Sequence, residues 1–164
     1  MLMKPKSLFL MCGTPGSGKS TWIKSQTENM KYPYAVVSRD AIRFSMVNED
    51  EEYFSKEDAV FEEFIKQIRS ALAVCDVVFV DATHLTEKSR NKTLDRLNLK
   101  DVDVYPVNFD LPECVCLDQN ENRKGTRAYV PRSVIRRMHS QYVVPTDGEK
   151  HKYKDILTIT IKED

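Results

Sequence analysis

The sequence predicts an α/β domain in which a five-stranded, mainly parallel sheet is flanked by helices. Strand-like apolar runs alternate with segments of helical periodicity, which is the pattern of parallel-sheet proteins. The length of 164 residues suits one domain with one packed core. Hydrophobic residues make up 41% and charged residues 30%, a globular composition that excludes wholesale disorder. We therefore expect a single domain over residues 1–164.

Five apolar runs predict the strands, in chain order at residues 7–12, 35–38, 77–81, 102–109 and 156–161. The third run is apolar throughout until it ends in Asp81, so we expect a strand buried on both faces. Pro106 removes a hydrogen-bond donor from the fourth run, which predicts an edge strand or a bulge there.

Helices are predicted between these strands, at about 19–29, from Asp40 onward, at 55–75, 86–97, 112–122 and 131–142. The clearest of them opens with a predicted capping box, Ser55 with Asp58 three residues later. Its buried stripe follows at helical spacing and comprises Phe61, Phe64, Ile65, Ile68 and Leu72. The acidic run at 48–52 before this helix predicts a solvated loop.

Charge and cysteine usage exclude several classes of protein. The 25 basic and 25 acidic residues cancel, so the chain is no general nucleic-acid coat protein, and an acidic partner must meet a local basic patch. No apolar run approaches the roughly 20 residues of a membrane span, and we expect no membrane partner. The four cysteines contain no C-x-x-C pair, which argues against zinc. We expect an intracellular, cytoplasmic protein without disulfides.

One glycine-rich motif carries most of the chemistry. The stretch GTPGSGKS at 13–20 matches G-x-x-x-x-G-K-[ST] at every defined position, between a predicted strand and a predicted helix. Its backbone N–H groups and the positive helix end can cradle phosphates. Lys19 is suited to the β- and γ-phosphates and Ser20 to Mg²⁺. The sequence thus predicts ATP with Mg²⁺, bound by Gly13, Thr14, Pro15, Gly16, Ser17, Gly18, Lys19, Ser20 and Thr21.

Two carboxylates are predicted beside this loop. Asp81 ends a strand at the edge where open α/β sheets bind ligands, and we assign it to Mg²⁺ together with Ser20. Asp40 is predicted at a helix N-terminus, with Arg43 one turn later on the same face. Such a carboxylate suits a general base, and Arg43 suits the phosphate of an incoming substrate.

A basic segment predicts a lid. Between Asn122 and Thr146 there is no acidic residue, and Gly125 and Pro131 bracket a loop at about 123–130. A basic loop between helices in a triphosphate-binding chain is suited to clamp the transferred group. We assign Arg127 to the nucleotide. The basic residues of the segment are Arg123, Lys124, Arg127, Arg132, Arg136 and Arg137.

The stretches GTPGSGKST, SRDAIR, VVFVDATH and NRKGTRAYVPRSVIRRM resemble the kinase domain of bacteriophage-type polynucleotide 5′-kinases in order and spacing, from about Leu8 to Tyr142. The resemblance implies a P-loop kinase fold with a basic lid and ATP and Mg²⁺ as cofactors. It also implies the 5′-hydroxyl end of RNA or DNA as substrate, and it fits a phage-encoded protein.

The family's site residues carry over by position. The Asp of its R-D-x-x-R motif, which activates the 5′-hydroxyl, matches Asp40, and the Arg that binds the neighbouring 3′-phosphate matches Arg43. The catalytic lid arginine matches Arg123 when the motif N-x-x-R is aligned on Asn120, whereas alignment on the glycine points to Lys124. The family's D-T-N reads D-A-T-H here, which places Thr83 and His84 at the substrate, with a histidine in place of an amide.

The leading hypothesis is therefore an ATP-dependent polynucleotide 5′-hydroxyl kinase. The related small P-loop kinases and zeta-toxin-like proteins also carry a carboxylate after the second strand and act on sugars or nucleotides. A kinase of a small hydroxyl metabolite, a nucleotide sugar or an aminoacyl-tRNA is thus the second hypothesis. The third is a nucleotide-hydrolysing switch without a phosphoryl acceptor.

Overall fold

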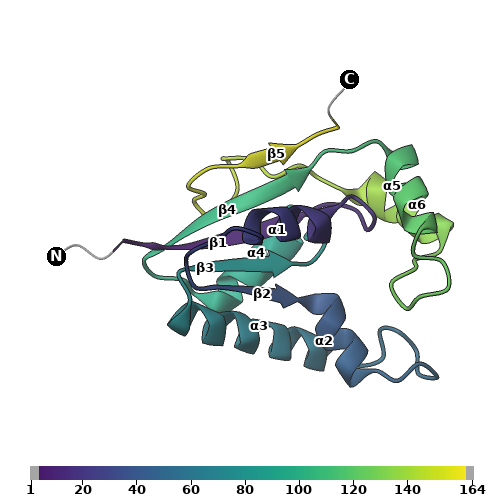
Figure 1. Ribbon diagram of the computed structural model, residues 1–164, viewed down its shortest axis with the longest axis horizontal. Helices are drawn as coiled ribbons and strands as arrows, with labels where there is room; N and C mark the ends of the chain where they lie inside the picture. The colour runs from purple at the N-terminus through teal and green to yellow at the C-terminus, as the bar shows by residue number, and fades with distance from the viewer. Residues whose placement is uncertain (1–3, 162–164) are drawn as a thin grey trace.

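A computed structural model describes residues 4–161, which form one parallel sheet with helices on both faces (Figure 1). The strands are β1 (Lys6–Cys12), β2 (Tyr34–Ser38), β3 (Val77–Asp81), β4 (Val102–Phe109) and β5 (Leu157–Ile159). The helices are α1 (Lys19–Thr27), α2 (Arg39–Met46), α3 (Glu57–Val74), α4 (Glu87–Leu97), α5 (Glu113–Glu121) and α6 (Arg132–Gln141). The predicted five-stranded α/β fold is confirmed. The two ends of the predicted domain, 1–3 and 162–164, lie outside the described residues.

The strand order β2-β3-β1-β4-β5 places β1 at the centre, and every pairing is parallel. The strands β2 and β3, which follow β1 in the sequence, lie on one side of it. The later strands β4 and β5 lie on the other side, so the direction in which strands are added reverses at β1. This reversal creates a switch point at the carboxyl end of β1, where open sheets bind ligands. The register pairs Leu10 with Val80 and Ser38 with Asp81, so β1, β2 and β3 end side by side.

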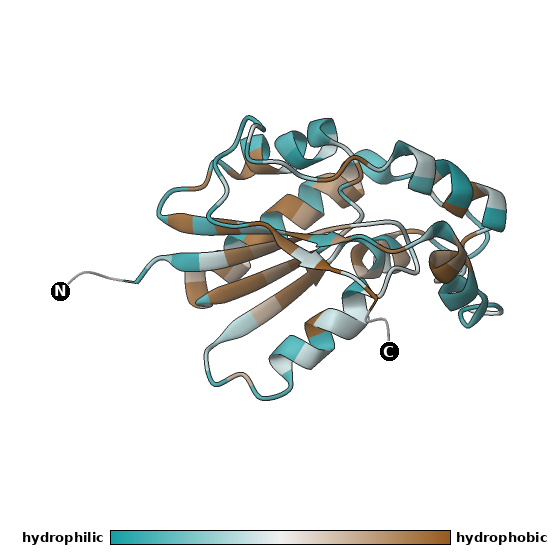
Figure 2. Ribbon diagram, turned by 90° about the horizontal axis from the view of Figure 1, so that it is seen from above, coloured by the Kyte–Doolittle hydropathy of each residue, from teal (hydrophilic) through white to brown (hydrophobic). Residues whose placement is uncertain are grey.

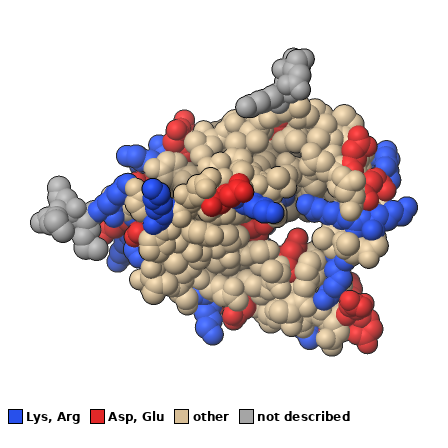
Figure 3. Space-filling view, in the orientation of Figure 1, with Lys and Arg blue, Asp and Glu red and all other residues tan. Residues whose placement is uncertain are grey.

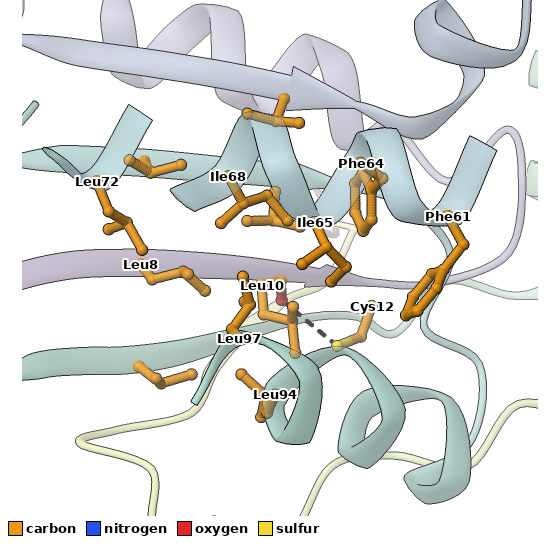
Figure 4. Packing of buried hydrophobic residues seen from close by; sticks show 14 of the residues in the cluster. Leu8, Leu10, Cys12, Phe61, Phe64, Ile65, Ile68, Leu72, Leu94 and Leu97 are labelled. Atoms are coloured by element: carbon orange, nitrogen blue, oxygen red, sulfur yellow. Dashed lines mark hydrogen bonds between the residues drawn. The ribbon is translucent and has the colours of Figure 1, made fainter. Parts of the chain in front are cut away.

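Side chains alternate between two cores, one on each face of the sheet. Leu8 and Leu10 of β1 pack against the buried stripe of α3 and against Leu94 and Leu97 of α4 (Figure 4). Met11, the next residue along β1, faces the opposite side and joins the smaller cluster of Ile23, Phe79, Val107 and Phe109. Figure 2 shows the result as apolar strands enclosed by helices with polar outer surfaces. Within residues 4–161, no helix is long and apolar enough to cross a membrane.

The buried stripe predicted for α3 is confirmed, but the capping box before it is wrong. The helix begins at Glu57 after Lys56, and no side chain caps it. Ser55 belongs to the preceding turn, in which its backbone N–H donates to the carbonyl of Glu52. A capping box does open α4, where Thr86 and Ser89 bond reciprocally.

The prediction of an edge strand or bulge at Pro106 is also wrong, because β4 lies between β1 and β5 and its register continues through the pair Leu10 and Pro106. The carbonyl of Val104 accepts a hydrogen bond from Lys154 on the β5 side. Backbone groups two residues apart on a strand face the same side, so Pro106 faces that side too. Pairing with β5 starts only at Val107, and no ladder donor is needed at the proline.

Candidate active site

The glycine-rich loop joins β1 to α1 and depends on glycine at two positions. Gly16 has a φ of +83°, and a Cβ there would meet the carbonyl oxygen of Cys116 at 2.5 Å. Gly18, at φ +91°, is the N-cap of α1, and no side chain caps the helix there. The first N–H groups of α1 are therefore available to an anion, as phosphate-binding loops require.

Lys19 is the charge at the centre of the loop. The residue is 8% exposed, and its Nζ donates to the carbonyls of Gly13 and Thr14, both at 3.0 Å. Burial lowers its pKa, which the nearby Asp81 partly offsets. No carboxylate within the described residues forms an ion pair with it. A buried ammonium held only by carbonyls is electrostatically costly, so the loop suits an anionic ligand such as a triphosphate.

Ser20 and Asp81 meet beside the loop. The hydroxyl of Ser20 donates to Oδ2 of Asp81 at 2.9 Å, which joins the start of α1 to the end of β3. Burial raises the pKa of Asp81, against the opposing effects of Lys19 and of this hydrogen bond. Hard oxygen ligands next to a phosphate site are what Mg²⁺ prefers. The two residues fit the ion, which would neutralise charge on the phosphates.

Asp40 lies in the first turn of α2, where the Ser38 hydroxyl caps the helix by accepting from the N–H of Ala41. Its side chain is 62% exposed. Because Ser38 pairs with Asp81 in the sheet, α2 starts beside the predicted metal site. The charge of Asp40 raises the pKa of both Lys19 and Asp81, so all three groups share one electrostatic environment. The sequence placed Asp40 correctly at the start of a helix.

Arg43 is buried, and all three nitrogens of its guanidinium make hydrogen bonds to side chains. Its Nε and one terminal nitrogen bind the two oxygens of Glu57 at 3.0 and 2.6 Å, and its other terminal nitrogen binds Asp40 at 2.5 Å and the Tyr53 hydroxyl at 3.1 Å. Arg39 binds the same Glu57 carboxylate at 2.7 Å. In this arrangement Arg43 holds Asp40 instead of presenting a free guanidinium to a substrate phosphate. Sequence reasoning missed Tyr53 and Glu57.

The predicted lid is the connection between α5 and α6. Asn120 closes its base, because its side-chain amide donates to the Val130 carbonyl at 2.6 Å and accepts from the Val130 N–H at 3.1 Å. Arg123 is half-buried, and its charge lowers the pKa of both Lys19 and Asp81. Lys124 is exposed. Of the two candidate lid cations, this geometry favours Arg123.

Arg127 lies in the loop between α5 and α6 and contacts the end of α2. Its guanidinium donates to the carbonyls of Phe44 and Val47 at 3.0 and 2.7 Å and stacks over the Phe44 ring at 4.7 Å. These contacts fasten the predicted lid to the end of α2, and the assignment of Arg127 to the nucleotide stays a prediction. Figure 3 shows the opening that remains between the part carrying α5 and α6 and the part carrying α2, with charged side chains on its rim.

Thr83 and His84 follow β3, and both make hydrogen bonds to the segment where β1 ends and the loop begins. The Thr83 carbonyl accepts from the N–H of Gly13 at 2.8 Å. His84 is 4% exposed, with Nδ1 at 3.1 Å from the Met11 carbonyl and Nε2 at 3.0 Å from the Thr93 hydroxyl. Burial lowers its pKa to about 3. Both ring nitrogens are occupied by the protein, which removes His84 from the candidate substrate contacts.

A buried ion pair behind the loop was also missed by the sequence analysis. Arg90 bonds both oxygens of Glu149 at 2.8 Å and donates to the carbonyls of His84 and Val143 at 2.9 Å. The pair ties the segment after α6 to the turn that supports the loop. Its partners lie 59 residues apart, and no local pattern links them.

A phosphate loop after β1 and a carboxylate at the end of β3, on a five-stranded parallel sheet flanked by helices, define the fold of P-loop kinases, a kinase-type phosphotransferase fold. Residues 8–145 match the family model described as an AAA domain, and the chain belongs to this family. A search of curated proteins finds no match.

Solved structures agree on the fold. The "Pnkp1/Rnl/Hen1 RNA repair complex" matches with a TM-score of 0.73 at 21% identity, over 85% of this chain and 45% of that one. The chain thus spans less than half of that protein. A fungal RNA kinase matches with a TM-score of 0.67 at 12% identity, over 100% and 78% of the two chains. A gluconokinase from Sinorhizobium meliloti matches with a TM-score of 0.59 at 17% identity, over 99% and 86%.

Proposed function

We propose that the protein transfers the γ-phosphate of ATP to the 5′-hydroxyl of an RNA or DNA end. The observation that carries the proposal is the position of Asp40. An exposed carboxylate stands in the first turn of α2, beside the carboxyl end of β3, in the electrostatic environment of Lys19 and Asp81. A hydrolytic switch needs no such carboxylate on the acceptor side, whereas transfer to an alcohol needs a proton acceptor.

The reaction follows from these positions. The acceptor hydroxyl gives its proton to Asp40 while its oxygen forms a bond to the γ-phosphorus. The bond from that phosphorus to the bridging oxygen of ADP breaks, and ADP leaves with the electron pair. Lys19 and Arg123 stabilise the charge that spreads over the transferred group. Mg²⁺, held by Ser20 and Asp81, would supply further positive charge at the phosphates.

Two observations support a nucleic-acid acceptor. The lid and α6 carry a run of basic residues without an acidic one, which suits a phosphorylated chain. Two of the similar structures come from an RNA repair complex and an RNA kinase. The second candidate, a small hydroxyl metabolite, is favoured by the likeness to a gluconokinase and by the acidic run at 49–52, next to Tyr53.

Transfer of labelled γ-phosphate separates the candidates. The acceptors are 5′-hydroxyl oligoribonucleotides and oligodeoxyribonucleotides, nucleoside 3′-monophosphates and sugars, each with wild type and Asp40→Asn. We expect label on an oligonucleotide and a loss of about 10²–10⁴-fold in the variant, the usual contribution of proton-transfer catalysis. Label on a sugar alone would establish the second candidate. Release of inorganic phosphate with no labelled acceptor would establish the switch.

A further inference from the structure

The loop between α2 and α3 reaches back to the candidate general base. The hydroxyl of Tyr53 donates to Oδ1 of Asp40 at 2.9 Å and accepts from Arg43 at 3.1 Å. Arg43 binds the same Oδ1 at 2.5 Å and lies over the Tyr53 ring at 4.7 Å. Asp40, Arg43 and Tyr53 thus form a closed triangle in which each side chain contacts the other two.

This triangle treats the two oxygens of Asp40 differently. Oδ1 accepts two hydrogen bonds, whereas no residue in the described part of the chain bonds to Oδ2. An exposed aspartate side chain would otherwise rotate about χ1 and χ2, and its carboxylate would face the acceptor for only part of the time. Two donors on one oxygen fix the plane of the group and leave the other oxygen to the acceptor hydroxyl.

We propose that Tyr53 is a positioning residue of the phosphoryl-transfer site: its hydroxyl orients Asp40 so that Oδ2 meets the acceptor hydroxyl. The loop that carries Tyr53 thereby belongs to the acceptor side of the site.

A purely structural role fits Tyr53 poorly. The residue is 38% exposed, and its neighbour Phe54 is more exposed still, so the ring adds little to the core. The edge contacts of the ring with Phe44 and Phe54 and its stacking with Arg43 need no hydroxyl. The hydroxyl oxygen of Tyr53 is thus the part of the side chain that contacts Asp40.

The inference rests on the proposed function only in that an acceptor hydroxyl meets Asp40. It holds for a nucleic-acid end and for a sugar alike. The test therefore uses whichever acceptor of the panel the wild-type chain labels. If only a sugar is labelled, the proposed acceptor class fails, while Tyr53 is still tested on that sugar.

Tyr53→Phe removes the hydroxyl and keeps the ring. We expect kcat for the acceptor to fall about 10- to 100-fold, as for the loss of a hydrogen bond to a charged group at a site that demands orientation. The KM for ATP and the unfolding temperature should stay the same. Tyr34→Phe is the matched control, since Tyr34 is 42% exposed at the far end of β2 and makes no side-chain hydrogen bond within the described residues.

A double-mutant cycle with Asp40→Asn separates positioning from direct contact. Once Asp40 can no longer accept the proton, its orientation stops mattering, so Tyr53→Phe should change the residual rate less than about twofold. An equal loss in both backgrounds would show that Tyr53 acts on the substrate itself and would overturn the proposal. A wild-type kcat for Tyr53→Phe alone would overturn it too.

A readout without activity completes the test. Burial and the negative charge of Asp40 raise the pKa of Tyr53 to about 12. In protein labelled with ¹³C at the tyrosine Cζ, the Tyr53 resonance, assigned through Tyr53→Phe, should titrate at lower pH in Asp40→Asn than in wild type. An unchanged titration would mean that the two groups are not in contact in solution, and the proposal would fall.

Discussion

The hydroxyl of Ser20 and the carboxylate of Asp81 are hydrogen-bonded at 2.9 Å although they lie 61 residues apart in the sequence. Ser20 lies in the first turn of the helix after the central strand, and Asp81 ends the neighbouring strand. The contact thus records the parallel pairing of β1 with β3 at their carboxyl ends. It brings two oxygen ligands together beside the buried ammonium of Lys19.

This pair predicts the response to magnesium. Ser20→Ala and Asp81→Asn should each raise the Mg²⁺ concentration for half-maximal transfer about 10- to 100-fold, the usual effect of weakening a metal's ligand shell. The measurement is transfer rate against Mg²⁺ at saturating ATP. Ser25→Ala, on the exposed side of the same helix, is the control and should leave the curve in place. Equal curves for all variants would exclude the pair from the metal site.

Lys19 is expected to be indispensable for transfer. Lys19→Ala removes the buried charge between the predicted phosphate positions, and no second ammonium shares its environment of carbonyl groups within the described residues. Transfer should fall below detection, and ATP affinity, measured by calorimetry, should fall with it. Lys24→Ala, an exposed change on the same helix, should behave as wild type. Near-normal turnover of Lys19→Ala would place the active site elsewhere.

The lid cation can be assigned by comparing neighbours. Arg123 is half-buried and electrostatically coupled to Lys19 and Asp81, whereas Lys124 is exposed. Arg123→Ala should therefore lower kcat more than ATP affinity, because its charge matters most as charge spreads in the transition state. Lys124→Ala should have the smaller effect. The reverse order in single-turnover kinetics would transfer the role to Lys124.

The hydrogen bonds of Arg127 to the end of α2 predict how often the lid opens locally. Arg127→Ala removes two hydrogen bonds to the end of α2, each worth about 1 kcal/mol net. Amide hydrogen exchange over residues 122–131 should become roughly 30-fold faster. Arg137→Ala, an exposed change of equal charge on α6, should leave the exchange rates alone. Unchanged exchange in Arg127→Ala would mean that the lid is held by its base at Asn120.

The site residues that lie at or just after the end of a strand could be predicted from the sequence. A glycine-rich loop, Asp40 and Asp81 each come just after an apolar run, and a parallel sheet brings the carboxyl ends of its strands to one edge. The buried stripe of α3 could also be predicted, because helical periodicity depends only on residues that are close in the sequence. The five strands and the helices between them were also predicted, whereas the order β2-β3-β1-β4-β5 depends on long-range pairing that the sequence pattern does not show.

The contacts that the sequence did not reveal depend on irregular segments. Tyr53 reaches Asp40, and Arg127 reaches Phe44, only because the loops that carry them fold back over α2. Neither loop has a periodicity that sequence reasoning can use. His84 was misplaced for another reason: its φ of +42° turns the ring into the core, and a backbone angle of this kind is set by the surrounding structure.

The buried His84 also predicts how stability depends on pH. Burial lowers its pKa in the folded chain to about 3, whereas an unfolded histidine has a pKa of about 6.5. Above about pH 6.5 both states are neutral there, and the stability is fully present. As the pH falls, the unfolded chain takes up the proton first, so about 1.4 kcal/mol of stability is lost per pH unit between roughly 6 and 4.

His84→Asn isolates this contribution, since asparagine tolerates the positive φ of the position and does not titrate. The difference in unfolding free energy between wild type and variant, from urea titrations at pH 7, 6, 5 and 4, should shift toward the variant by about 1.4 kcal/mol per unit below pH 6. A constant difference between wild type and His84→Asn across the series would mean that His84 opens to solvent and takes up its proton in the folded state.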